Sequence, residues 1–105
     1  MDVPERYFSS IFVLRVIKGM PPDAEFRVAG TAKVGRSRDN DIFIVDPSVS
    51  RSHAVLDVRN GELVVRDNGS TNGTFVNGER VQLRTLKDGD IVAFGKTQMR
   101  VVAAP

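Results

Sequence analysis

The sequence predicts an all-β domain, a β-sandwich of two sheets with about ten or eleven short strands and with polar loops gathered at one end. Apolar and polar residues alternate with a period of two along most of the chain, and turn residues recur roughly every eight to twelve positions. The three-four spacing of amphipathic helices is not evident in any segment. The chain has 105 residues and no internal repeat. We therefore expect one domain, over residues 11–103.

Alternation predicts four strands in the first half of the chain, at residues 11–18, 25–28, 33–35 and 42–45. Pro21 and Pro22 force an irregular turn after the first strand, because proline fixes φ and has no N–H to donate. Ala29 and Gly30 end the second strand.

The second half predicts six more strands, at residues 53–59, 62–67, 74–76, 80–81, 91–94 and 98–103. The pairs Asn60–Gly61 and Asn77–Gly78 tolerate the positive φ angles of tight hairpins. Asp88–Gly89 begins the last turn.

Composition limits the compartment and the partners. The chain has no cysteine, which is natural in a reducing compartment, and we expect it in the cytoplasm. Residues 1–10 carry Asp, Pro and Glu where a secretory signal would be basic, and we expect them to be either disordered or packed as an extra segment. Fifteen Lys and Arg against 13 Asp and Glu leave a charge of +2, too small for a general nucleic-acid footprint. No apolar run is long enough to span a membrane.

Three polar clusters follow apolar runs. Residues 69–74 read GSTNGT, residues 50–53 read SRSH, and Gly35 precedes Arg36. Such small, hydroxyl, amide and guanidinium groups do not fill a core, so they belong to loops that present hydrogen-bond donors. A phosphate group needs several charge-assisted hydrogen bonds and an arginine fork, and it is the ligand that this collection favours.

The chemistry assigns a task to each group. Arg36 supplies a fixed cation, and the hydroxyls of Ser50 and Thr71 rotate to suit an anion. Backbone N–H groups beside Gly69 and Gly73 add further donors. The amide of an asparagine such as Asn72 can pair with an extended peptide backbone, because it offers both a donor and an acceptor.

The order GR, SxxH, STNGT resembles the forkhead-associated (FHA) domain, a β-sandwich that binds phosphothreonine peptides. The resemblance covers about residues 11–102, including the Val76–Gly78 and Asp88–Asp90 turns. It implies a non-catalytic signalling module whose partner is a phosphothreonine-containing protein or peptide, with no cofactor. The site residues that it implies fall into three groups: Arg36, Ser50 and Thr71 for the phosphate, Arg51 and Asn72 for the peptide main chain or the phosphate, and Gly35, His53, Asp67, Ser70 and Gly73 as support.

The sequence gives little support for an enzyme or for a metal site. Ser50 and His53 could suggest a hydrolytic pair, but no GxSxG elbow and no orienting acid accompany them. Gly95-Lys96-Thr97 imitates the end of a P-loop, but Asp90 stands where its first glycine belongs. Asp39-Asn40-Asp41 imitates a calcium loop, but the required glutamate position holds a serine. We predict no enzyme activity and no metal.

Two alternatives stay open beside phosphothreonine binding. The first is an interaction or scaffold domain of the same fold that engages its partner through a sheet face without phosphate. The second is a small barrel that binds single-stranded nucleic acid, which would need stacking aromatics among the basic residues. It is disfavoured because four phenylalanines lie in apolar runs that read as core: Phe12, Phe26, Phe43 and Phe94. We therefore expect no nucleic-acid and no membrane partner.

Overall fold

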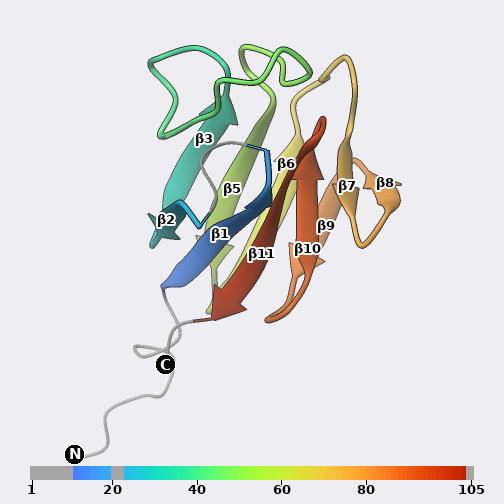
Figure 1. Cartoon of the computed structure of the whole chain (residues 1–105). Coiled ribbons are helices and arrows are strands. Elements are labelled where there is room, and N and C mark those ends of the chain that lie inside the picture. Colours follow the sequence, from blue (N-terminus) through green and yellow to red (C-terminus); the bar gives the residue numbers. More distant parts are fainter. Residues whose placement is uncertain (1–10, 20–22, 104–105) are drawn as a thin grey trace, which may run out of the picture.

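The structure is a computed structural model, and it describes residues 11–19 and 23–103. These residues form eleven β-strands in two sheets that pack face to face (Figure 1). The predicted all-β sandwich is confirmed. The expectations for residues 1–10 and for the turn at Pro21 and Pro22 lie outside the described residues.

The first sheet has six strands in antiparallel order β2-β1-β11-β10-β7-β8. Its strands are β1 (Phe12–Lys18), β2 (Glu25–Val28), β7 (Thr74–Val76), β8 (Glu79–Val81), β10 (Ile91–Phe94) and β11 (Thr97–Ala103). The pairing of β1 with β11 joins the two ends of the described chain, with Leu14 opposite Val101.

The second sheet has five strands in the order β4-β3-β5-β6-β9, and only its β3–β4 pair is parallel. Its strands are β3 (Thr31–Gly35), β4 (Ile42–Phe43), β5 (Ala54–Arg59), β6 (Glu62–Asp67) and β9 (Leu83–Leu86). Strand β9 was not predicted from the sequence. It lies at the sheet edge, and only its last residue is buried, so it lacks the alternation that marks the other strands.

Two predicted strands differ from the structure by two residues at one end, and four others, β1, β5, β8 and β11, differ by one residue. Strand β3 begins at Thr31, two residues earlier than predicted, because Thr31 and Ala32 still pair with β5. Strand β4 is only Ile42–Phe43 instead of residues 42–45, and Val45 is 71% exposed. The chain leaves the sheet there, which frees the following residues to form a loop.

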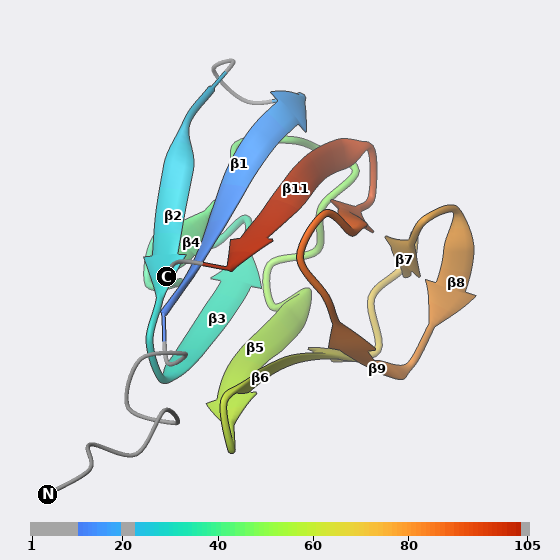
Figure 2. The ribbon, with the colours of Figure 1, turned by 90° about the horizontal axis from the view of Figure 1, so that it is seen from below.

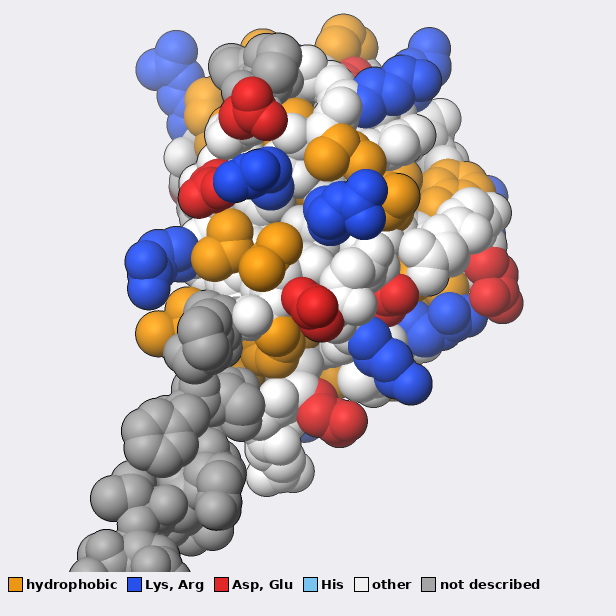
Figure 3. Space-filling model, turned by 60° about the horizontal axis from the view of Figure 1, so that its bottom comes forward, with side chains coloured by type: hydrophobic (Ala, Val, Ile, Leu, Met, Phe, Trp, Pro, Cys, Tyr) orange, Lys and Arg blue, Asp and Glu red, His pale blue; other side chains and the backbone are white. Residues whose placement is uncertain are grey.

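The connections separate into two ends. The polar end holds the loops at residues 36–41, 44–53 and 68–73 and the turn at residues 95–96 (Figure 1). The opposite end holds the turns at residues 29–30, 60–61, 77–78 and 87–90, which Figure 2 views from below. Figure 3 shows hydrophobic, basic and acidic side chains interspersed at that end, so charge of one sign does not gather on the visible face.

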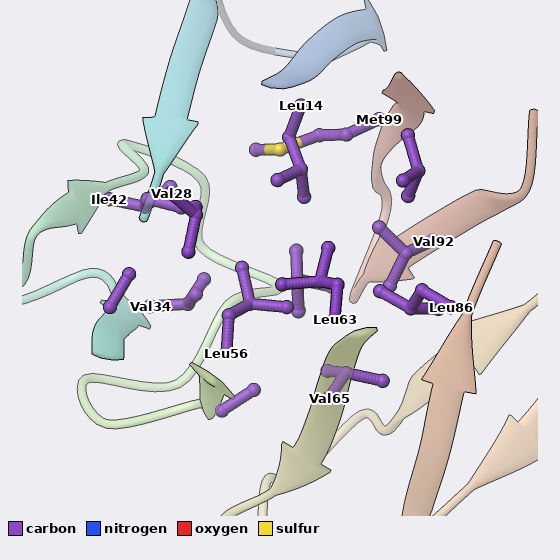
Figure 4. Close-up of a cluster of buried hydrophobic side chains, with 14 of the residues drawn as sticks. Leu14, Val28, Val34, Ile42, Leu56, Leu63, Val65, Leu86, Val92 and Met99 are labelled. Carbon is purple, nitrogen blue, oxygen red and sulfur yellow. The ribbon is translucent and has the colours of Figure 1, made fainter. Parts of the chain in front are cut away.

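The hydrophobic core fills the space between the sheets (Figure 4). Leu14 and Met99 from the first sheet meet Leu56 and Leu63 from the second, and all four side chains are fully buried. Each such side chain contributes about 1.5–3 kcal/mol to stability through burial. The core fixes the distance between the sheets, and through them the positions of the loops at the polar end.

Two of the four phenylalanines that the sequence placed in the core are buried. Phe12 and Phe94 lie in the core, and half-buried Phe26 packs against it. Phe43 is half-buried and is not part of the core cluster. The described residues include no helix long and apolar enough to cross a membrane.

Candidate functional site

Backbone hydrogen bonds hold the loops of the polar end against one another. The N–H of Arg36 donates to the carbonyl of Ser50 at 3.0 Å, and the N–H of Ser37 donates to that of Arg51 at 3.3 Å. The third loop joins them through the N–H of Thr71, which donates to Ser50 Oγ at 3.1 Å. Ser50 therefore links all three loops.

Gly35 ends β3, where the backbone of the first loop passes close to that of the second. It is buried, and a Cβ at this position would lie 2.0 Å from the Arg51 carbonyl oxygen and 2.7 Å from Asn40 Nδ2. Asn40 Nδ2 itself donates to the carbonyls of Arg51, at 2.7 Å, and Ser37, at 2.9 Å. Only glycine allows this approach, so residue 35 sets the position of the neighbouring Arg36.

His53 connects two loops from the interior. Its Nδ1 accepts the Ser50 N–H at 3.0 Å, so Nε2 carries the proton and donates to the Gly73 carbonyl at 2.9 Å. The ring is fully buried and packs edge-on against Phe94, with centroids 5.7 Å apart. Burial lowers the pKa of His53, outweighing the opposing effects of the Gly73 carbonyl and Asp67. The neutral form therefore holds both loops.

Asp67 holds the third loop in shape. Its carboxylate accepts hydrogen bonds from the N–H and hydroxyl of Ser70, and from the hydroxyl of Thr74 at 2.7 Å. Ser70 Oγ in turn accepts the Gly73 N–H at 3.0 Å. Burial alone would raise the pKa of Asp67, but these hydrogen bonds to the charged form outweigh it and lower the pKa. The carboxylate is thus ionised at neutral pH and fixes the turn.

The groups predicted to bind phosphate are brought together by this framework. Arg36 is exposed, and its Nε donates to the Val49 carbonyl at 2.9 Å. This bond leaves the terminal nitrogens of the guanidinium outside the hydrogen bonds found among the described residues. Ser50 is partly buried beside it, and Thr71 is exposed across the loop interface. A cation and two hydroxyls therefore open to solvent at the same place.

The two residues predicted to contact a peptide also lie at the polar end. The side chains of Arg51 and Asn72 are exposed. Asn72 Nδ2 donates to the Ser48 carbonyl at 2.8 Å, which orients the amide and leaves its oxygen outside the hydrogen bonds found in the described chain. Asn72 therefore also ties its own loop to the loop of residues 44–53, a role that the sequence did not indicate.

A further polar cluster was missed by the sequence reasoning. Asp46 accepts hydrogen bonds from the N–H and hydroxyl of Ser48 and from Thr97 Oγ1, the last at 2.7 Å. Ser48 Oγ accepts the Lys96 N–H at 2.8 Å, and a Cβ on Gly95 would lie 2.5 Å from Ser48. The P-loop-like segment, residues 95–97, thus contains the β10–β11 turn and is bonded to the loop of residues 44–53. Aspartate two positions before a serine is a common turn signal, but the bond to Thr97 spans 51 residues.

The sequence profile of the FHA domain matches residues 32–95. The ABC transporter ATP-binding/permease protein Rv1747 of Mycobacterium tuberculosis is 47% identical over 70 residues, which are 67% of this chain and 8% of that protein. The glycogen accumulation regulator GarA of Mycolicibacterium smegmatis is 44% identical over 75 residues, which are 71% of this chain and 48% of that protein. The chain thus spans less than half the length of these two relatives.

The fold is similar to that of a solved FHA domain structure. A structure from a structural and functional analysis of phosphothreonine-dependent FHA domain interactions superposes with a TM-score of 0.83 and 29% identity, covering 90% of this chain and 98% of that one. The profile match includes the three loops of the polar end, at residues 36–41, 44–53 and 68–73. This chain belongs to the FHA domain family.

Proposed function

We propose that this chain is a non-catalytic module that binds phosphothreonine-containing proteins and peptides in signalling interactions. The observation that carries the proposal is the convergence of exposed Arg36 with Ser50 and Thr71, on loops that buried side chains hold in place. Membership of the FHA domain family supports it, as does the similarity to a structure studied for phosphothreonine-dependent interactions.

The phosphate would bind between the three groups. The guanidinium of Arg36 gives charge-assisted hydrogen bonds to two phosphate oxygens, and the hydroxyls of Ser50 and Thr71 donate to the remaining oxygen acceptors. Each bond to the charged ligand contributes about 1.5–3 kcal/mol. Three or four such bonds account for micromolar binding, near 8 kcal/mol, after the cost of ordering the peptide.

The peptide main chain would lie across Asn72 and Arg51. The oxygen of the Asn72 amide is available to a peptide N–H while its Nδ2 holds Ser48. The backbone of Arg51 is fixed by Asn40 and Ser37, so its exposed side chain extends from a rigid base. Rigid loops lower the entropy lost on binding.

The geometry supports binding without catalysis. In a hydrolytic pair the histidine accepts the proton of the serine hydroxyl. Here the Nδ1 of His53 bonds the backbone N–H of Ser50, and its Nε2 is engaged by Gly73. Neither ring nitrogen is left for proton transfer. A reducing compartment such as the cytoplasm is the proposed location, in keeping with a chain without cysteine.

The test is fluorescence anisotropy with a degenerate peptide library fixed in turn as phosphothreonine, phosphoserine and unmodified threonine. We expect binding only to the phosphothreonine set, and at least about a tenfold loss in Arg36→Ala, equivalent to about 1.4 kcal/mol. Arg27→Ala, an exposed arginine on β2, is the matched control and should bind as the original chain does. Equal binding of all three libraries, or full binding by Arg36→Ala, would favour the phosphate-independent scaffold instead.

A further inference from the structure

The outer face of the second sheet carries a hollow that the proposed phosphate site does not use. It has a volume of about 560 Å³ and lies over strands β5, β6 and β9. Its aliphatic lining comes from Val55, Val64 and Leu83. The two valines are half-buried, and Leu83 is 64% exposed. A leucine this open on an edge strand contributes little to the fold.

Strand register explains how the hollow is composed. Val55 on β5 lies opposite Arg66 on β6, and Arg66 lies opposite Leu83 on β9, so these three side chains form one row across the outer face. In the next row Asp57 lies opposite Val64. Aliphatic and charged groups therefore alternate across the floor instead of forming a purely apolar patch.

The charges in the hollow are not balanced. Asp57, the acidic residue in the lining, already accepts hydrogen bonds from Arg59 Nε and from Thr31 Oγ1. Arg84 is engaged outside the hollow by Glu79, at 2.9 Å. Arg66 is exposed and has no carboxylate within ion-pair distance among the described residues. Arg59 and Thr31 lower the pKa of Asp57 and Arg66 adds to this effect, but no ion pair in the described chain engages the Arg66 guanidinium. Its positive charge lies between two aliphatic side chains, those of Val55 and Leu83.

We propose that this hollow docks an unphosphorylated, extended acidic segment of a partner protein that carries an aliphatic side chain. Arg66 pairs with a carboxylate of the segment, and the aliphatic side chain covers Leu83 and Val64. The contact is weak alone, because a hollow of this size buries less area than a stable interface needs. Since β6 leads directly into the loop that holds Thr71, one partner can occupy the hollow and the polar end together and bind more tightly through both.

The test uses a ten-residue, acetylated and amidated peptide of alternating Glu and Leu, added to the ¹⁵N-labelled full chain and followed by amide chemical shifts. We expect shifts on β6 and β9, and none with the same peptide carrying Lys in place of Glu. Arg66→Glu should weaken binding at least about tenfold, and Leu83→Ser about threefold or more. Both side chains are exposed, and a thermal melt of each variant checks the fold.

Two controls separate this proposal from others. Arg27→Glu reverses a charge on the opposite sheet and should bind the acidic peptide nearly as well as the original chain. Arg66→Glu should bind a phosphothreonine peptide normally, so failure of the docking surface and failure of the phosphate site give different results. The proposal is overturned by an absence of shifts at millimolar peptide, by shifts confined to residues 36–53 and 68–73, or by an equal loss in Arg27→Glu.

Discussion

The two ends of the sandwich use the same kinds of residue in different ways. Asn, Gly and Asp occur both in the loops at the polar end and in the turns at the opposite end. The buried polar side chains of the described residues, however, all lie at or beside the polar end: His53, Asp67, Ser70, Thr74 and Thr97. At the opposite end the turns rely on local conformation, with positive φ at Asn60 (53°) and Asn77 (51°) and exposed hydrogen bonds.

The difference shows where the chain requires a defined loop structure. A buried polar group is costly unless every hydrogen bond is made, so such groups specify one arrangement of their surroundings. Among the described residues no buried side-chain nitrogen or oxygen lacks a partner. The polar end therefore has loops that are rigid before any ligand arrives, while the opposite end has turns that only reverse the chain. Substitutions at matched positions in the two ends can test this contrast.

The largest effect is expected from a methyl group at Gly35. Gly35→Ala places Cβ 2.0 Å from the Arg51 carbonyl oxygen, so the two loops must separate. We expect the free energy of unfolding to fall by about 3 kcal/mol. Gly30→Ala at the opposite end meets no atom within 4 Å and should change stability by less than about 1 kcal/mol. Urea unfolding of both variants makes the measurement, and similar losses in the two would contradict the contrast between the ends.

A smaller loss is expected from the buried carboxylate. Asp67→Ala leaves the N–H of Ser70 and the hydroxyl of Thr74 without their acceptor, which should cost about 2–3 kcal/mol of stability. The matched variant is Asp90→Ala at the opposite end. Asp90 accepts hydrogen bonds from Asn77 Nδ2 and the Lys87 N–H in an exposed setting, and we expect a loss of about 1 kcal/mol or less. If Asp90→Ala were the more damaging change in urea unfolding, buried polar groups would not distinguish the ends.

Much of this arrangement could be predicted from the sequence, and the exceptions share a cause. Alternation predicted ten strands, because it depends on residues near in sequence. Strand β9 was missed because an edge strand with one buried residue has no such pattern. The polar loops were recognised because their residue types do not suit a core.

Contacts between distant residues could not be predicted in the same way. The bond from Thr97 to Asp46 joins segments that no local pattern relates. Asn40 was considered only as part of a calcium-like run, whereas its side chain holds the Arg51 carbonyl. The hollow around Arg66 depends on the register of three strands, which a single sequence does not specify. The pattern of neighbouring residues therefore predicted most of the strands. The contacts between side chains depend instead on how segments distant in the sequence pack together.

The smallest effect is expected from pH, and it should arise at the polar end. Burial lowers the pKa of His53 below its ordinary value near 6.5, so the unfolded chain takes up a proton at a higher pH than the folded chain. Stability should therefore be constant above about pH 7.5 and fall as the pH decreases through 6.5, until the folded chain is protonated too. Because His53 is the one histidine in the sequence, the change in stability over this pH range reports on its bonds to Ser50 and Gly73. Urea unfolding from pH 8 to 5 without a phosphopeptide makes the measurement, because the ionisation of the phosphate then plays no part. His53→Gln should be less stable but should lose the pH dependence over this range; an unchanged slope would mean that the buried ring does not couple the polar end to pH.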